Sequence, residues 1–252
     1  MTLYLIGLGL GDEKDISIKG LEAVKQCAKL YLENYTSILQ CSVSQLEKLY
    51  GKKVQVVGRE FCEQGADKLV QEGKKQDIAL LIVGDPFSAT THTEIFKSAK
   101  KTGVPIIVIN NASILTAIGI TGLQLYKFGK TTSLPFPEEQ PNVETPYLVL
   151  GENQKMGLHT LILLDLRPEE DKFVTVNQAL EALEQMEKRK KNRLIHPDLL
   201  VIGCARLGSK DFLVKSGKLK YLKKFDFGKS PHCLIIPGKL HFAEEEMLEE
   251  WK

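Results

Sequence analysis

The chain has 252 residues, of which 43% are hydrophobic and 26% charged, and its formal net charge is +2. This balance excludes a protein that depends on a strong positive field to bind nucleic acid or a membrane surface. No apolar run approaches the roughly 18 residues needed to cross a bilayer, and the length allows one large domain or two of about 120 residues each.

The N-terminus and the cysteines are typical of a cytoplasmic protein. The first residues lack a basic region and become acidic at Asp12, so we expect a strand there and not a signal peptide. The cysteines are odd in number and show no C-x-x-C spacing, which favours reduced thiols. They are Cys27, Cys41, Cys62, Cys204 and Cys233.

In the first half, predicted strands and helices alternate. Short apolar runs predict the strands, and helical spacing, such as Ile18, Leu21 and Val24, predicts the helices. The alternation predicts a mostly parallel sheet covered on both faces. The expected strands are 2–7, 29–33, 54–57, 78–83 and 106–109, and the expected helices are 17–26, 42–49, 66–72 and 92–101.

The stretch 80–94, LLIVGDPFSATTHTE, joins a buried strand to a helix. Gly84-Asp85-Pro86 ends the strand, and Thr91 and Glu94 have the spacing of a capping box. Ligands bind at this end of open α/β sheets, where helix N-termini offer free N–H groups. His92 is therefore either a partly exposed residue of the helix cap or a residue beside the ligand.

A glycine-rich turn, GLGLGD at 7–12, follows the first strand. It resembles a dinucleotide fingerprint but has Asp12 where the fingerprint needs Gly or Ala. Glu33 could stand in for the acid that binds the ribose. The turn predicts that backbone, and not side chains, lies next to the ligand.

The second half is predicted to be rich in strands. We expect a short helix at 112–120, a boundary between domains 1–122 and 123–252, and an irregular loop marked by Pro135, Pro137, Pro141 and Pro146. Thr175 and Gln178 have the spacing of a further capping box, as do Ser42 and Gln45 in the first half. The expected strands are 161–166, 199–204, 212–215 and 233–236, and an acidic helix is expected at 242–251.

Motifs for covalent catalysis and for metal binding are missing from the sequence. There is no G-x-S-x-G or Walker loop, and the histidines lack metal-ligand spacing, so no metal is expected. The basic run 188–193 is either a solvated helix end or a contact for an acidic protein or RNA. The glutamates Glu244, Glu245, Glu246, Glu249 and Glu250 are expected to form a solvated face.

Several strings, in this order and spacing, are similar to those of the diphthine synthases, in the tetrapyrrole-methylase-like class of S-adenosylmethionine-dependent methyltransferases. The resemblance covers nearly the whole chain and is least at 138–154. The strings are LYLIGLGL (3–10), GDP (84–86) with ATTH (89–92), ASI (112–114), GITGLQLYKFG (119–129), GLHTL (157–161), AR (205–206) with GS (208–209), and PGKLH (237–241).

The resemblance implies two α/β domains, S-adenosylmethionine in the cleft between them with S-adenosylhomocysteine as product, and a homodimer. It implies repeated methylation of the amino group on the 3-amino-3-carboxypropyl-modified histidine of translation elongation factor 2, giving diphthine. The archaeal and eukaryotic branches of the family differ in the number of methyl groups. No catalytic base is implied. The implied donor-binding residues are Leu10, Asp85, Ser88, Ser113, Ile114, Leu164, Leu207 and His232.

Two alternatives remain open at this point. One is a methylase of the same fold that acts on a porphyrin-like ring. The other is a non-catalytic regulator that binds a nucleotide with the glycine-rich turn. Neither nucleic acid nor a membrane is expected as a partner.

Overall fold

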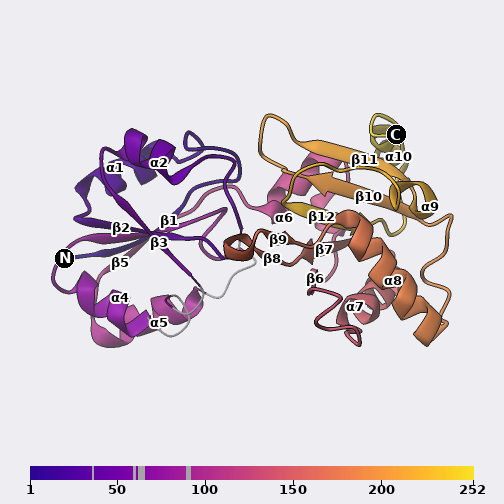
Figure 1. The fold of residues 1–252 in the computed structure, drawn as a ribbon, viewed down its shortest axis with the longest axis horizontal. Helices are drawn as coiled ribbons and strands as arrows, with labels where there is room; N and C mark the ends of the chain where they lie inside the picture. The colour runs from indigo at the N-terminus through magenta and orange to yellow at the C-terminus, as the bar shows by residue number, and fades with distance from the viewer. Residues whose placement is uncertain (36, 59–60, 62–65, 89–91) are drawn as a thin grey trace. The chain divides into compact units, whose positions relative to one another are not determined.

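The computed structural model describes residues 1–35, 37–58, 61, 66–88 and 92–252 (Figure 1). The chain forms two compact α/β units. Unit 1 comprises Met1–Ala117 and Gly208–Lys210, and unit 2 comprises Ile118–Leu207 and Asp211–Lys252. Whether 1–122 and 123–252 fold as independent domains stays a prediction.

Unit 1 contains a five-stranded sheet with the order β3-β2-β4-β1-β5, and every pairing in it is parallel. Helices α4 and α5 cover one face and α1 and α2 the other (Figure 1). The predicted parallel architecture is thus confirmed. The elements are β1 (Leu3–Gly7), α1 (Ile18–Gln26), β2 (Lys29–Glu33), α2 (Val43–Tyr50), β3 (Val54–Val57), α4 (Ala66–Gly73), β4 (Ile78–Ile82), α5 (Thr93–Thr102), β5 (Ile106–Ile109) and α6 (Ile114–Ala117).

The helix predicted at 17–26 is present as α1, whereas the predicted start of α5 was wrong. Ile18 is 80% exposed, because α1 turns Gly20, Ala23 and Val24 toward the core instead. Helix α5 begins at Thr93 with His92 as its N-cap, and His92 makes no side-chain cap bond. Thr91, the expected capping residue, lies outside the described residues.

Unit 2 contains a second five-stranded sheet with the order β11-β10-β12-β7-β6. The β6–β7 pairing is parallel and the others are antiparallel. Its elements are η1 (Ile118–Thr121), η2 (Leu125–Lys127), β6 (Thr132–Leu134), α7 (Thr145–Lys155), β7 (Thr160–Leu164), β8 (Leu166–Arg167), η3 (Pro168–Glu170), β9 (Lys172–Phe173), α8 (Val176–Lys190), β10 (Leu200–Ala205), β11 (Leu213–Lys218), α9 (Leu219–Leu222), β12 (His232–Ile236) and α10 (Phe242–Glu249).

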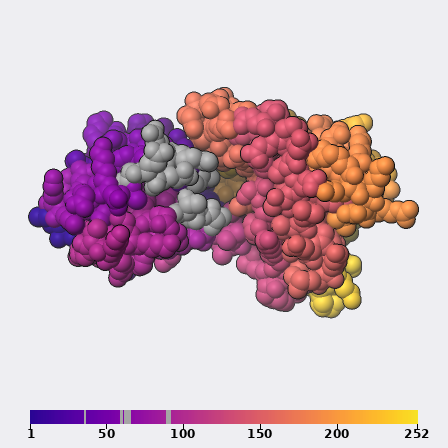
Figure 2. Space-filling model, turned by 90° about the horizontal axis from the view of Figure 1, so that it is seen from below, coloured from indigo at the N-terminus to yellow at the C-terminus, as the bar shows by residue number. Residues whose placement is uncertain are grey.

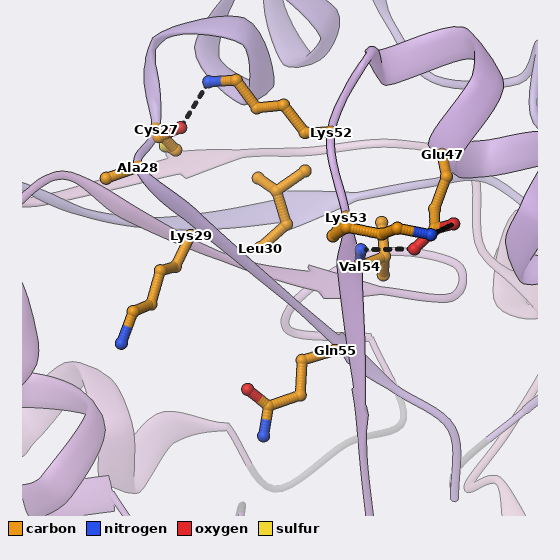
Figure 3. A pocket seen from close by; sticks show the side chains of 9 residues that line it. All are labelled: Cys27, Ala28, Lys29, Leu30, Glu47, Lys52, Lys53, Val54 and Gln55. Atoms are coloured by element: carbon orange, nitrogen blue, oxygen red, sulfur yellow. Dashed lines mark hydrogen bonds and ion pairs between the residues drawn. The ribbon is translucent and has the colours of Figure 1, made fainter.

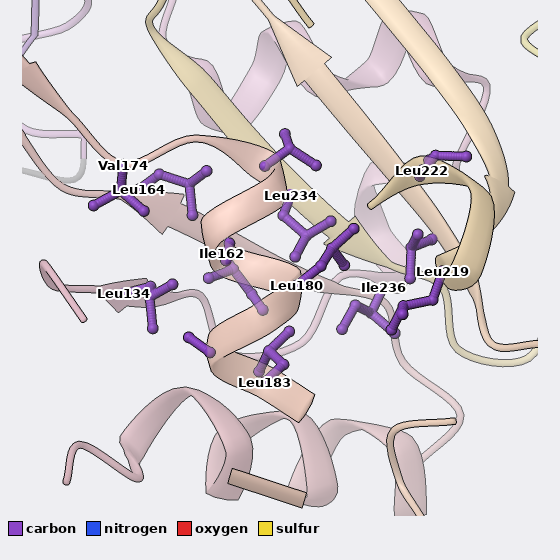
Figure 4. Packing of buried hydrophobic residues seen from close by; sticks show 14 of the residues in the cluster. Leu134, Ile162, Leu164, Val174, Leu180, Leu183, Leu219, Leu222, Leu234 and Ile236 are labelled. Atoms are coloured by element: carbon purple, nitrogen blue, oxygen red, sulfur yellow. The ribbon is translucent and has the colours of Figure 1, made fainter. Parts of the chain in front are cut away.

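The core of unit 2 lies between the sheet and α8 (Figure 4). Leu180 and Leu183 of α8 pack with Ile162 of β7 and Leu234 of β12. The capping box predicted at Thr175 is present and starts this helix. On the face of unit 2 that the space-filling view shows, residues between 130 and 190 (pink to orange) form much of the surface (Figure 2).

Helix α7 was not predicted, because four prolines in the preceding stretch indicated a loop. The last of them, Pro146, lies in the first turn of α7. Proline is tolerated there, since the first N–H groups of a helix have no intrahelical acceptor. The small strands β6, β8 and β9 and the single-turn helix α9 were also not predicted.

A buried ionic network ties α10 to the rest of unit 2. Glu244 is fully buried, so its predicted solvation was wrong. Its carboxylate accepts hydrogen bonds from His159 Nε2 (2.9 Å), Gln124 N (2.9 Å) and His241 N (2.8 Å), and pairs with the Lys127 ammonium. Burial raises the pKa of Glu244, but Lys127 and the other donors outweigh it and lower that pKa to about 2.

Replacing Glu244 with Gln should destabilise the protein, because the Lys127 ammonium loses its counter-charge. We expect the free energy of unfolding, measured by urea denaturation at pH 7, to fall by about 3 kcal/mol. The stabilisation by the wild-type carboxylate is fully present above the ordinary Glu pKa of about 4.3. It is lost as the pH falls through the folded pKa of about 2.

Glu246→Gln is the matched control, since Glu246 lies exposed on the same helix. It should change the free energy of unfolding by no more than about 0.5 kcal/mol. Equal stability of the two variants would show that the network does not stabilise the fold.

Candidate functional site

In unit 1, the segments that follow β1, β4 and β5 meet at the carboxyl end of the sheet. Gly9, after β1, and Gly84, after β4, exchange two backbone hydrogen bonds, Gly84 N to Gly9 O (2.7 Å) and Gly9 N to Gly84 O (3.3 Å). The Asn111 side chain, after β5, donates to the carbonyl of Gly7 (3.0 Å) and to that of Asp15 (3.0 Å). The three strand ends are therefore joined by hydrogen bonds.

Asp85 is the centre of this arrangement. One carboxylate oxygen accepts from Phe87 N (3.0 Å) and Ser88 Oγ (3.1 Å), and the other from Asn110 Nδ2 (2.9 Å) and Asn111 N (3.2 Å). Burial raises the pKa of Asp85, but these donors outweigh it, so the pKa lies below its ordinary value. Asp85 is thus a carboxylate whose hydrogen-bonding capacity is used to shape the loop.

The sequence analysis missed Asn110 and Asn111 as partners of Asp85. The signal was present, because two amides directly after a buried strand reach the same sheet edge as Asp85.

The other predicted residues of unit 1 lie in the same segments. Ser88 donates to Asp85, and the Leu10 side chain lies 3.6 Å from the position of a Cβ at Gly84. Ser113 is buried just before α6, and Ile114 is the first residue of α6. These segments offer backbone groups, hydroxyls and apolar surface to a ligand.

In unit 2, the three predicted residues lie at one end of the second sheet. Leu164 ends β7, His232 begins β12, and Leu207 follows β10. His232 Nδ1 accepts from Val176 N (3.4 Å), while Nε2 donates to the carbonyls of Gly228 (3.2 Å) and Lys229 (3.1 Å). Burial lowers the pKa of His232, so its imidazole is neutral and fastens α8 to the loop before β12.

Arg206, in the Ala-Arg string, also serves the structure. Its guanidinium binds Asp211 through Nε (2.8 Å) and donates to the carbonyls of Phe227 (3.1 Å) and Lys229. Two residues later the chain enters unit 1, where the Gly208 carbonyl lies 2.7 Å from the position of a Cβ at Gly11.

His92 is only 1% exposed, so the expectation of a partly exposed cap residue was wrong. Its Nδ1 lies 3.3 Å from the Pro86 carbonyl and its Nε2 lies 3.9 Å from the Glu33 carboxylate, which is also buried. Burial lowers the pKa of His92, and Glu33 opposes this shift. The pair supports the loop that carries Asp85.

The glycine-rich turn does not have the geometry of a dinucleotide site. A Cβ at Gly9 would lie 2.7 Å from the Asp15 side chain, so protein fills the side that a pyrophosphate needs. Helix α1 begins only at Ile18, well after the turn, whereas the fingerprint opens its helix at once. Glu33 is buried and accepts a hydrogen bond from Tyr35 N (2.8 Å).

A hollow of about 470 Å³ lies at the opposite end of the first sheet, near the starts of β2 and β3 (Figure 3). Its lysines are already engaged. Lys52 donates to the carbonyls of Lys25 (2.6 Å) and Cys27, Lys53 pairs with Glu47 (2.9 Å), and Lys29 pairs with Glu72. These contacts occupy the lysine ammonium groups, and we assign no ligand to the hollow.

The basic run ends α8. Lys188, Arg189 and Lys190 form its last turn, Lys191 is the C-cap, and Lys190 pairs with Glu144 (2.5 Å). A helix C-terminus favours cations, which agrees with the interpretation as a helix end.

Several negative findings concern the described residues alone. They contain no group of three or more His, Cys, Asp or Glu that could hold a metal ion. None of their helices combines the length and apolar character needed to cross a membrane. The described cysteines, Cys27, Cys41, Cys204 and Cys233, are free thiols, and Cys62 lies outside this part of the chain.

Comparison with known proteins identifies the family. Residues 2–223 match the tetrapyrrole (corrin/porphyrin) methylases. The chain is 48% identical to the diphthine synthase of Methanocaldococcus jannaschii, over 98% of this chain and 97% of the relative. It is 43% identical to the diphthine methyl ester synthase of Dictyostelium discoideum, over 100% and 98%.

A solved structure agrees. A crystal structure of diphthine synthase superimposes with a TM-score of 0.91 at 39% identity, covering 100% of this chain and 96% of the other. The fold, the family match and the full-length relatives together show that the chain belongs to the tetrapyrrole (corrin/porphyrin) methylases, in the group that contains the diphthine synthases.

Proposed function

We propose that this chain is an S-adenosylmethionine-dependent methyltransferase of diphthamide biosynthesis. Its acceptor is the amino group of the 3-amino-3-carboxypropyl-modified histidine of elongation factor 2, which it methylates repeatedly to give diphthine. The observation that carries the proposal is the 48% identity to a diphthine synthase along nearly the whole length of both chains. We place this activity in the cytoplasm, where translation occurs.

The proposed donor-binding residues fit the chemistry of S-adenosylmethionine. This donor presents an adenine, a ribose and an amino acid end, which need backbone groups, hydroxyls and apolar surface. The segments that contain Leu10, Asp85, Ser88, Ser113 and Ile114 supply such groups. The proposal adds Leu164, Leu207 and His232 from unit 2, on the strength of the shared motifs.

The residues of this chain position the reacting groups and do not act as nucleophiles. When bound, the donor supplies an electrophilic methyl group on a sulfonium. The protein then needs to hold a neutral amine in line behind that methyl, and such positioning can lower a barrier by about 7–11 kcal/mol. This requirement agrees with the neutral His232 and the fully engaged Asp85, neither of which is a free nucleophile.

The acceptor test compares elongation factor 2 with and without the aminocarboxypropyl group, using radiolabelled donor. Only the modified factor should be labelled, because an unmodified imidazole offers no aliphatic amine. Equal labelling of both forms would contradict the proposal. So would turnover of a porphyrin-like ring in the absence of labelling of either factor.

Asp85→Ala should weaken binding of S-adenosylhomocysteine roughly tenfold or more. The loop loses the hydrogen bonds that the carboxylate accepts, and hydrogen bonds to a charged group contribute about 1.5–3 kcal/mol each. Isothermal titration measures the affinity, and NAD serves as a ligand that should not bind either protein. Asp85→Asn keeps one acceptor oxygen, so its affinity for S-adenosylhomocysteine should lie between those of the wild type and Asp85→Ala.

Glu94→Gln is the control for this change, because Glu94 lies exposed and pairs only with Lys97 among the described residues. Circular dichroism must show that the Asp85 variants are folded. Unchanged affinity in a folded Asp85→Ala protein would reduce Asp85 to a turn residue, and tight NAD binding by the wild type would refute the donor assignment.

We further propose that the protein is a homodimer, on the basis of the family resemblance. Sedimentation velocity at micromolar concentration should give twice the 28.2 kDa of one chain. A single species at 28.2 kDa would refute this proposal.

A further inference from the structure

Asp165 occupies a fixed place beside the proposed donor-binding residues of unit 2. It directly follows Leu164 at the end of β7. Its backbone N–H donates to the Leu134 carbonyl (3.0 Å), and its own carbonyl accepts from Val174 N (2.9 Å). The main chain at Asp165 is thus held from both sides, while the side chain is only partly buried.

The Asp165 carboxylate has one oxygen to spare. The other oxygen accepts from Leu166 N (3.0 Å), and this is the only hydrogen bond to the side chain within the described part of the chain. Asp85 differs, because its two oxygens already accept four hydrogen bonds. Of these two acids, only Asp165 can therefore receive a further donor.

The cations near Asp165 in the sequence are committed to other groups. Arg167 binds Glu139 (2.9 Å for Nη1), and Lys172 binds both Glu138 (3.0 Å) and Glu139 (2.7 Å). Both cations also lie over the Phe136 ring. Other charged or titratable groups on the neighbouring elements include Glu169, Glu170 and Asp171 of the β8–β9 hairpin, His232 and Cys233 of β12, and Arg206 and Asp211 after β10.

The reaction requires removal of a proton from the acceptor. The acceptor is an α-amino group, and its ordinary pKa of about 8 or higher leaves it mainly as an ammonium ion without a free lone pair at pH 7. Each transfer to the nitrogen therefore requires that a proton leaves first. A carboxylate can attract the ammonium ion and accept that proton.

We propose that Asp165 binds the acceptor ammonium and accepts its proton before each methyl transfer, an inference that rests on the function proposed above. The proton moves from R–NH3+ to the carboxylate, which leaves R–NH2 and a carboxylic acid. The nitrogen lone pair then forms the N–C bond while the C–S bond breaks, and that bond's electron pair stays on sulfur as a neutral thioether. Asp165 returns its proton to water, and the new cationic nitrogen is deprotonated in turn until it is quaternary.

Asp165→Asn tests this role. At pH 7 the rate of methyl transfer should fall about 100-fold or more, the lower range for loss of a general base. The deficit should shrink as the pH rises, because the amine then loses its proton without help. The affinity for S-adenosylhomocysteine should not change. Mass spectrometry of the factor should show mono- and dimethylated intermediates accumulating at pH 7.

Two further variants separate a chemical role from a structural one. Asp165→Glu keeps the carboxylate and should keep the wild-type dependence of rate on pH, at a reduced rate. Glu169→Gln removes an exposed acid of the β8–β9 hairpin, which directly follows Asp165. This variant should have the wild-type rate and pH dependence.

A wild-type pH dependence in Asp165→Asn would overturn the inference, as would a weakened affinity for S-adenosylhomocysteine, which would make Asp165 a donor-binding residue. These outcomes leave the proposed function intact if the wild type labels the modified factor. If the wild type labels neither form of the factor, the proposed function itself fails.

Discussion

The four hydrogen bonds that Asp85 accepts are the constraint on which the carboxyl end of the sheet in unit 1 depends. They fix the loop after β4 to the segment after β5, and the Gly9–Gly84 pairing adds the turn after β1. A carboxylate with this many donors stays ionised and resists movement. The loop that it holds therefore has a definite shape before any ligand arrives, which lowers the entropic cost of binding.

Unit 2 uses its polar residues in the same way. His232 and Arg206 join loops to helices and strands, and Glu244 holds three separate segments around its carboxylate. Their side chains are occupied by structural contacts, so few reactive groups remain. A methyltransferase tolerates this, because the reactivity resides in the donor and the protein contributes mainly geometry.

The sequence was sufficient where structure is decided locally. Strands β2, β3 and β5 have the predicted bounds, and the capping boxes at Ser42 and Thr175 are both present. Prediction failed where the outcome depends on distant residues. The burial of Glu244 requires His159 and Lys127, which lie far away in the sequence.

In the candidate site, too, the sequence indicated residues but not their distant partners. The family resemblance implied roles for Asp85 and His232, but the segments that they hold together are seen only with partners such as Asn111 and Val176 in place. Helix α7 was not predicted for another reason. From the sequence alone, a proline in the first turn of a helix cannot be distinguished from a proline in a loop.

The short segment Gly208–Lys210 belongs to unit 1, although the chain on both sides of it belongs to unit 2. Its Gly208 lies against Leu10 and Gly11 of the glycine-rich turn. During synthesis, the glycine-rich turn emerges from the ribosome about two hundred residues before its packing partner. At synthesis rates of about 5–20 residues per second, this turn stays unfinished for tens of seconds. The glycine-rich turn of the first unit is therefore completed only when most of the second unit has been made.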